Sequence, residues 1–187
     1  VAGVFLPGAS TQDVIRSIEK LDSRMQFNVI FFSHVAWSID APGENPADFG
    51  WNGLGPPPAV SYWPATDAKK KEFIAKLQAM EPQGNTQWYP PLKMAFRMQP
   101  PPQTVYLLSD GEPRDYEQVL HDMADYNPHK LPIDTIAFEL PGTPARYMMD
   151  VAQASGGQFS MVYKGKLIRG SAAKDLTSSK YDGEAKK

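Results

Sequence analysis

The sequence predicts an α/β fold, a doubly wound and mostly parallel sheet flanked by helices. Short apolar runs of strand length alternate with segments whose apolar residues recur at helical spacing. The apolar run at residues 104–108 is continuous and stops at Ser109-Asp110-Gly111, which is typical of a parallel strand buried on both faces. Strand–helix alternation with short connections places helices on both faces of one parallel sheet.

The individual elements follow from the same patterns. Four strands are expected, with residues 104–108 in the centre of the sheet. Thr11 is a candidate cap for the first helix, and Gly156-Gly157 closes the last one. The expected strands are residues 27–32, 104–108, 133–138 and 158–163, and the expected helices are residues 13–21, 66–80, 91–98, 115–126 and 144–155.

Composition limits the class of protein. A chain of 187 residues fits one domain with a sizeable core, and a net charge of −2 gives no sign of a general nucleic-acid binder. The absence of cysteine excludes disulfides, thiolate metal sites and cysteine nucleophiles, but leaves the compartment open. No apolar run approaches the roughly 20 residues of a membrane span, and no signal peptide is visible. Because the chain starts with Val1, we expect a processed or partial chain.

Residues 41–64 interrupt the alternation. This insertion contains six prolines and four glycines, a density that disfavours regular elements. Its aromatic residues, with Trp51 and Trp63 among them, either pin the loop to the domain or form a contact surface for a partner. Both interpretations stay open, and the second makes Trp51 and Trp63 candidate partner-binding residues.

Residues 164–187 follow the expected domain, which covers residues 1–163. Seven basic and three acidic residues give this tail a charge of +4, whereas the remaining twelve basic and eighteen acidic residues give −6. Low hydrophobicity after Ile168 predicts a flexible basic arm.

Thr86 and Asp110 are the candidate site residues. Open α/β sheets bind ligands beyond the carboxyl ends of their strands, so Asp110 points to such a site, and Thr86 lies in an earlier loop that could face it. A hydroxyl and a carboxylate are hard oxygen ligands suited to Mg²⁺ or another divalent cation. Two simpler roles stay open: Asp110 as a turn residue beside Gly111, and Thr86 as a helix cap ahead of Pro90. Glu112, beside the site, is either merely solvated or a partner contact.

An ordered set of motifs resembles the von Willebrand factor type A (vWA) domain over roughly residues 10–163. The resemblance implies a doubly wound fold and protein binding through a metal-ion-dependent adhesion site. It places the family's metal-site threonine on Thr86 and its later aspartate on Asp110, and it implies a protein partner or a neighbouring subunit. The motifs are residues 27–33, Gly84-Asn85-Thr86, residues 107–111, residues 133–137 and residues 154–157.

One departure from the family is serious. The first strand of the family ends in an Asp-x-Ser-x-Ser motif, and none precedes Phe27 here. Either the chain begins after that motif and lacks the central strand, or residues 1–6 are the strand and residues 7–11 replace the motif. We expect the first, because the second leaves a short first helix, and because Gly3 and Pro7 weaken a central strand. Another segment would then have to complete the sheet.

Catalysis has little support in the sequence, so we expect no enzyme. The three histidines lie in different elements, and no Gly-x-Ser-x-Gly, phosphate-binding or His-Glu-x-x-His motif is present. Three hypotheses remain: a protein-binding module of vWA type, a structural or assembly subunit with a vestigial metal site, and a hydrolase that uses Asp110 with His34.

Overall fold

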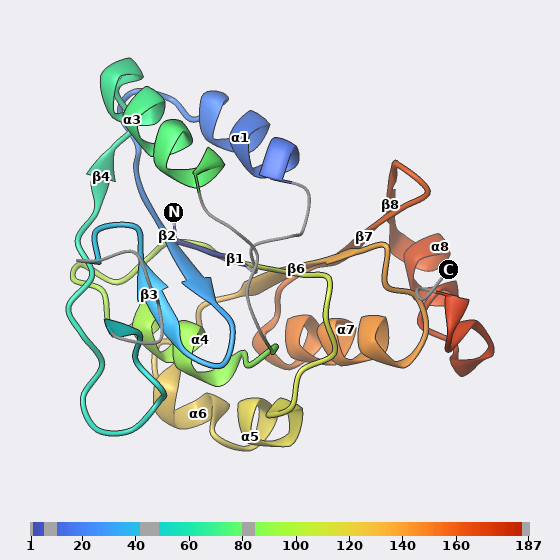
Figure 1. The fold of residues 1–187 in the computed structure, drawn as a ribbon. Helices are drawn as coiled ribbons and strands as arrows, with labels where there is room; N and C mark the ends of the chain where they lie inside the picture. Colours follow the sequence, from blue (N-terminus) through green and yellow to red (C-terminus); the bar gives the residue numbers. More distant parts are fainter. Residues whose placement is uncertain (1, 6–10, 42–48, 80–84, 185–187) are drawn as a thin grey trace.

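The computed structural model describes residues 2–5, 11–41, 49–79 and 85–184 of the chain. Gly84 of the family-like motifs, residues 6–10 and residues 185–187 lie outside these ranges. The described residues form one α/β unit, with a twisted sheet between two layers of helices (Figure 1).

The sheet has the order β3-β2-β1-β5-β6-β7-β8. Its strands β1 (Ala2–Phe5), β2 (Gln26–Phe32), β5 (Val105–Ser109), β6 (Ile133–Phe138) and β7 (Phe159–Tyr163) are mutually parallel. The two ends, β3 (Ala36–Ser38) and β8 (Lys166–Arg169), are antiparallel to their neighbours, and the short β4 (Trp63–Pro64) pairs with the start of β2. The predicted fold class and the central place of β5 are confirmed.

The expectation of a missing central strand is wrong, because β1 fills that position. Val4 pairs with Ile30 of β2 on one side and with Leu107 of β5 on the other. The two sequence objections have a physical answer. Main-chain pairing on both edges holds Gly3 in the ladder, and Pro7 is not part of β1, which ends at Phe5.

Helices cover both faces of the sheet (Figure 1). One face carries α1 (Thr11–Glu19) and α3 (Asp67–Gln78). The other carries α4 (Tyr89–Phe96), α5 (Tyr116–His121), α6 (Met123–Tyr126) and α7 (Thr143–Ser155). The helix expected over residues 115–126 is therefore two short helices, which meet at Asp122.

Sequence signals explain three of the helix ends. The Thr66 side chain accepts a hydrogen bond from the Lys69 amide at the start of α3. Prolines occupy the first turn of α4, where a missing N–H is tolerated. Gly156 ends α7 with φ 78°, a left-handed conformation that favours glycine.

The core lies in two layers, one on each face of the sheet. In β5, Val105 and Leu107 belong to the layer under α4–α7, whereas Leu108 belongs to the layer under α1 and α3. Because successive side chains of a strand point to opposite faces, a strand covered on both sides reads as a continuous apolar run. This explains why residues 104–108 identify a buried strand.

The aromatic residues of the insertion pin it to the domain, so Trp51 and Trp63 are not the exposed partner contacts that one interpretation expected. Trp51 pairs with Ala36 at the sheet edge, and its Nε1 donates to the Leu54 carbonyl over 2.7 Å. Trp63 lies in β4, packs edge-on against Phe73 and donates to Asp40 Oδ2 over 2.7 Å. Both indoles are at least nine-tenths buried, which removes them from contact with a partner.

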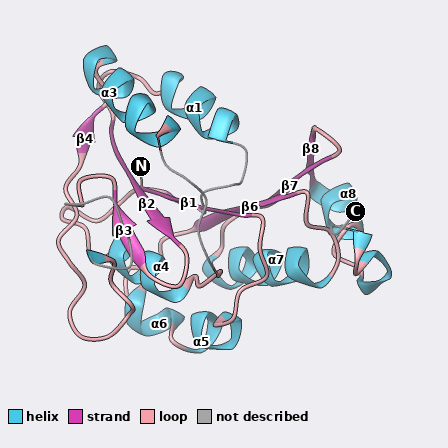
Figure 2. Cartoon of the chain, in the orientation of Figure 1, coloured by secondary structure: helices cyan, strands magenta, loops and turns pink. Residues whose placement is uncertain are grey.

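The expected flexible arm is instead part of the fold up to Glu184. β8 pairs with β7, and α8 (Gly170–Asp175) and a 3₁₀ turn (Ser179–Tyr181) follow it (Figure 2). Low average hydrophobicity misled the prediction, because a few well-placed apolar residues suffice. Leu176 is buried against the core, and Asp182 accepts hydrogen bonds from Thr143 N and Oγ1 at the start of α7.

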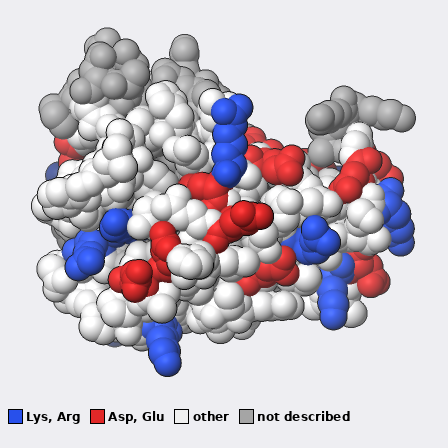
Figure 3. Space-filling model, turned by 90° about the horizontal axis from the view of Figure 1, so that it is seen from below, with Lys and Arg blue, Asp and Glu red and all other residues white. Residues whose placement is uncertain are grey.

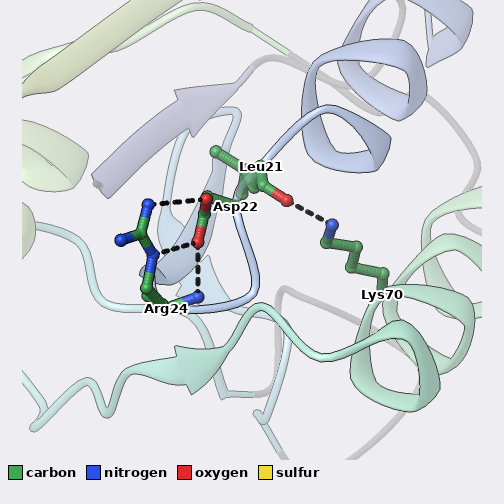
Figure 4. A network of polar contacts seen from close by, with 4 residues as sticks. All are labelled: Leu21, Asp22, Arg24 and Lys70. Atoms are coloured by element: carbon green, nitrogen blue, oxygen red, sulfur yellow. Dashed lines mark hydrogen bonds and ion pairs between the residues drawn. The ribbon is translucent and has the colours of Figure 1, made fainter.

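Lys70 joins α1 to α3. This mostly buried side chain of α3 donates to the carbonyls of Glu19, over 3.2 Å, and of Leu21, just beyond the end of α1 (Figure 4). The ammonium group therefore satisfies carbonyls that the helix end leaves without intrahelical partners. Beside it, Asp22 and Arg24 form a bidentate ion pair across the following turn (Figure 4).

Replacing Lys70 tests this link. Lys70→Ala should lower the free energy of unfolding by about 1.5–3 kcal/mol, because it removes charge-assisted hydrogen bonds from a mostly buried site. The exposed neighbour Lys71→Ala is the matched control and should change stability by no more than about 0.5 kcal/mol. Chemical denaturation of both variants makes the comparison, and equal losses would contradict the proposed link.

Candidate functional site

The candidate site lies where the strand order of the sheet reverses. β1 leads through β2 toward one edge, and its other neighbour β5 leads through β6 toward the opposite edge. Doubly wound sheets bind ligands outside the carboxyl ends of the strands at this switch point. Asp110, Gly111 and Glu112 directly follow the carboxyl end of β5, as the sequence predicts.

Thr86 and the residues after Asp110 are packed together. The Thr86 carbonyl accepts a hydrogen bond from the Arg114 amide over 3.1 Å. Gly111 lies so close that a Cβ added there would overlap Thr86 Oγ1. The following amide, Gln87 N, donates to the Ser33 carbonyl beyond β2 over 3.0 Å. The structure therefore brings three loops of the sheet edge into contact and places Thr86 against Gly111.

Ser109 fixes the course of this loop, although the sequence analysis assigned it no role. It is fully buried, and its Oγ lies 3.2 Å from both the amide and the carbonyl of Gly111. Trp88 Nε1 also donates to Ser109 Oγ over 3.4 Å. A hydroxyl at the end of a buried strand is the signal that could have revealed this anchor.

Asp115 is the second residue that the sequence analysis missed. Its two carboxylate oxygens accept the amides of Trp88 and Tyr89 over 2.9 and 2.8 Å, at the start of α4. Pro90 and Pro91 have no N–H, so these two amides are the donors left in the first turn. Asp115 therefore fills the capping role that was one alternative for Thr86. Burial raises the pKa of the Asp115 carboxyl, and its hydrogen bonds to the two amides partly oppose that shift.

Asp110 is a half-buried carboxylate without a cationic partner in the described chain. Burial raises the pKa of Asp110, and the hydrogen bond from its own amide only partly opposes the shift. Glu112, two residues further on, is exposed. The edge therefore combines a desolvated negative charge beside Thr86 with a solvated one at Glu112.

The donors present do not fit the metal site that the resemblance implies. No three histidine, aspartate or glutamate side chains gather closely enough to hold a metal within the described ranges. The sequence Leu6-Pro7-Gly8-Ala9-Ser10, which follows β1, contains no carboxylate either. Among the described residues of this edge, Asp110 and the exposed Glu112 are the carboxylates, which is too few negative ligands for a dedicated Mg²⁺ site.

His34 does not form the hydrolase pair with Asp110 in the structure. The imidazole is exposed, and its Nδ1 lies 3.3 Å from the hydroxyl of its neighbour Ser33. The described residues show no hydrogen bond between His34 and Asp110.

No described helix is long and apolar enough to cross a membrane.

A groove of about 530 Å³ opens beside the Asp110 loop. It begins at Gln87, next to Thr86, and continues along the start of α5 to Tyr147 of α7. The Tyr116 and Tyr147 rings stack in its wall with centroids 4.0 Å apart, and Tyr116 donates to Asp150 Oδ2 over 2.7 Å. The pKa of Tyr116 is raised to about 12, mainly by burial and secondly by this hydrogen bond to the Asp150 carboxylate. The lining residues are Gln87, Glu112, Pro113, Arg114, Asp115, Tyr116, Glu117, Gln118 and Tyr147.

Solved structures similar to this chain are vWA domains and related proteins. A von Willebrand factor type A protein from Catenulispora acidiphila matches 94% of the chain with a TM-score of 0.62 and 16% identity. Proximal thread matrix protein 1 from the mussel byssus, whose structure has a zinc-occupied adhesion-site motif, matches 94% of the chain with a TM-score of 0.58 and 16% identity. An aerotolerance-related membrane protein from Bacteroides fragilis matches 94% of the chain with a TM-score of 0.55 and 11% identity.

These similarities establish a vWA-like fold. The chain spans 40% and 43% of the first two proteins, and 94% of the Bacteroides protein. No protein-family model matches the sequence, and no curated protein matches it.

Substitution of Gly111 tests the close contact at the site. Gly111→Ala should destabilise the fold by about 1–3 kcal/mol, because the added methyl overlaps Thr86 Oγ1 and stands 3.3 Å from Thr86 Cβ. Rotation of Thr86 gives limited relief, since two of its three staggered χ1 positions place Oγ1 or Cγ2 in this space.

A double-mutant cycle measured by denaturation isolates this contact. Adding Thr86→Ala should recover part of the loss, whereas Thr86→Val, which keeps the branched shape, should not. Additive effects of Gly111→Ala and Thr86→Ala would show that the two residues do not meet.

The raised pKa of Asp110 predicts that Asp110→Asn increases the stability of the fold and that this increase depends on pH. Since the folded-state pKa lies above the unfolded-state value, the ionised carboxylate destabilises the fold at neutral pH, and this effect disappears below the unfolded-state pKa. With chelator present, Asp110→Asn should therefore unfold at a higher temperature than the unsubstituted chain at pH 7. The difference should vanish near about pH 3.

Asp67→Asn is the control and should lower stability at pH 7, since Asp67 lies in the first turn of α3, where a negative charge is favourable. An Asp110→Asn variant that is less stable than the unsubstituted chain at pH 7 would refute the assigned cause.

Proposed function

We propose that this vWA-like domain is a non-enzymatic module that binds another protein at the carboxyl edge of its sheet. The observation that carries the proposal is the packing at the switch point: Gly111 lies against Thr86, and the next residue, Glu112, lines an open groove, on a fold that many binding domains use. The loops there are anchored by buried hydrogen bonds rather than left free. A rigid edge of this kind suits recognition, because little order must be gained on binding.

The proposal does not rely on a tightly held metal. Mg²⁺ or another divalent cation remains what the vWA resemblance predicts, and one similar structure has zinc at its adhesion-site motif. Among the described residues, however, no three histidine, aspartate or glutamate side chains gather closely enough to hold a metal. We infer that the interface uses its side chains directly.

Site-specific photocrosslinking tests the binding proposal. A photoreactive phenylalanine analogue at Glu112 should give a discrete adduct in extract of the cells that produce the protein, and mass spectrometry identifies the captured protein. The same analogue at Lys71, on the opposite helical layer, is the matched control. Adducts of equal yield and identity at both positions, or none at Glu112, would reject the edge as the binding site.

Metal titration tests the second part of the proposal. Calorimetry with Mg²⁺, Mn²⁺ and Zn²⁺ should show no saturable heat up to millimolar concentration, and chelator should leave capture of the partner unchanged. Asp110→Ala and Glu112→Ala should then weaken capture to a similar extent. A much larger effect of Asp110→Ala that disappears in chelator would instead establish a metal-centred interface.

An assembly subunit is the second candidate, favoured by the uneven charge of the chain. Residues 164–187 carry +4 and the remainder −6, and such opposite charges favour attraction between copies of the chain. Sedimentation velocity at low and high salt distinguishes this candidate, which requires self-association that salt weakens.

A further inference from the structure

We propose that the groove beside Asp110 binds a segment of the partner protein that carries arginine or lysine side chains. This inference rests on the proposed function and adds the chemistry of the partner. It starts from the groove itself, which is a polar cleft about 530 Å³ in volume beside the switch point of the sheet.

The charge of the lining selects a cationic ligand. Three of the lining residues are carboxylates, Glu112, Asp115 and Glu117, whereas Arg114 is the only cation among them. Asp115 is occupied at the start of α4, so Glu112 and Glu117 are the free carboxylates. Both are exposed, and neither forms an ion pair with a described residue. The wider face seen in Figure 3 carries both acidic and basic side chains, so the groove owes its negative charge to these lining residues.

The aromatic wall suits the same ligand. Tyr116 and Tyr147 stack at 4.0 Å with their planes 23° apart, and both rings are half-buried at the groove. Arg146 already lies over the Tyr147 ring at 5.8 Å, so this wall accepts a guanidinium within the molecule itself. A planar cation that stacks near a tyrosine ring and pairs with a neighbouring carboxylate gains from both interactions.

The groove is ordered before any ligand binds. Asp115 ties it to α4, the Arg114 amide ties it to Thr86, and the Tyr116 hydroxyl ties it to Asp150 of α7. These bonds come from three different segments of the chain. A partner side chain can therefore enter a cleft that is already formed, which reduces the conformational entropy lost on binding.

Fluorescence anisotropy with defined peptides tests the inference. The probe is a short fluorescein-labelled peptide in which arginine alternates with glycine, and the matched probe replaces each arginine with its neutral isostere citrulline. The arginine peptide should bind saturably and the citrulline peptide should not. Glu112→Gln with Glu117→Gln should weaken binding about tenfold, as expected from the loss of two partly screened charge pairs.

Two further variants separate the groove from general attraction between opposite charges. Arg114→Gln should strengthen binding, because it removes the one cation of the lining, and Tyr147→Leu should weaken it, because it removes the aromatic ring while keeping an apolar side chain. The matched control, Glu19→Gln with Asp67→Asn, removes two carboxylates from α1 and α3 on the opposite layer and should leave the affinity unchanged.

Specific outcomes overturn the inference. Equal weakening by the control pair would show that the peptide responds only to the net charge of the protein. A citrulline peptide that binds as tightly as the arginine peptide would show that the cation plays no role. Self-association abolished by Glu112→Gln with Glu117→Gln would make the occupant a second copy of this chain. A photocrosslinked partner at Glu112 without any binding of the arginine peptide would leave the proposed function intact and reject the cationic ligand alone.

Discussion

The backbone hydrogen bonds of Ala2–Phe5 are the interactions on which the rest of the structure depends. This four-residue strand pairs with β2 on one side and β5 on the other, so it joins the two halves of the sheet. Without it, both neighbours would expose unpaired N–H and C=O groups in the middle of the domain, which is costly in a buried setting. The reversal of strand order that creates the candidate site also occurs at this strand. One short segment thus sets both the continuity of the sheet and the place where a ligand can approach it.

The loops at that place are held from several sides. Ser109 anchors the turn after β5, Asp115 holds the start of α4, and Gly111 permits the close approach of Thr86. The contacts of Asp115 and Gly111 join segments that lie far apart in the sequence. The carboxylates at the edge are therefore displayed on a fixed scaffold, which is what precise recognition requires. The remaining exposed charges, Glu112 and Glu117, give the adjacent groove its sign.

The sequence predicted the parts of this molecule in which local pattern and tertiary structure agree. Residues 104–108 formed a buried strand because its two faces are covered by separate apolar layers. The close approach of Thr86 to the Asp110 loop followed from the rule that strand ends converge. The first strand was misjudged because its four residues carry little signal and contain Gly3, whereas its stability comes from main-chain pairing with two distant strands.

Long-range contacts explain the other differences between prediction and structure. The C-terminal segment is hydrophilic on average, yet Leu176 and Asp182 secure it to the core and to α7. Trp51 and Trp63 were equally compatible with a surface and with a buried anchor, and their indole N–H partners, Leu54 and Asp40, cannot be read from composition. Asp115 escaped notice for a related reason. Its role depends on amides 26 and 27 residues earlier, at a helix start where two prolines supply no N–H.

The electrostatics of the edge give the final argument for a binding role. An aspartate whose carboxyl is half-buried without a counter-charge opposes folding, as the raised pKa of Asp110 indicates. A position selected for stability alone would favour a neutral side chain there. A ligand that brings positive charge to this edge would stabilise the ionised form, and the same ligand would meet Glu112 and Glu117 in the adjacent groove. A cationic group of the proposed protein partner would supply that charge without a metal. The same carboxylate that weakens the isolated domain would then strengthen the complex.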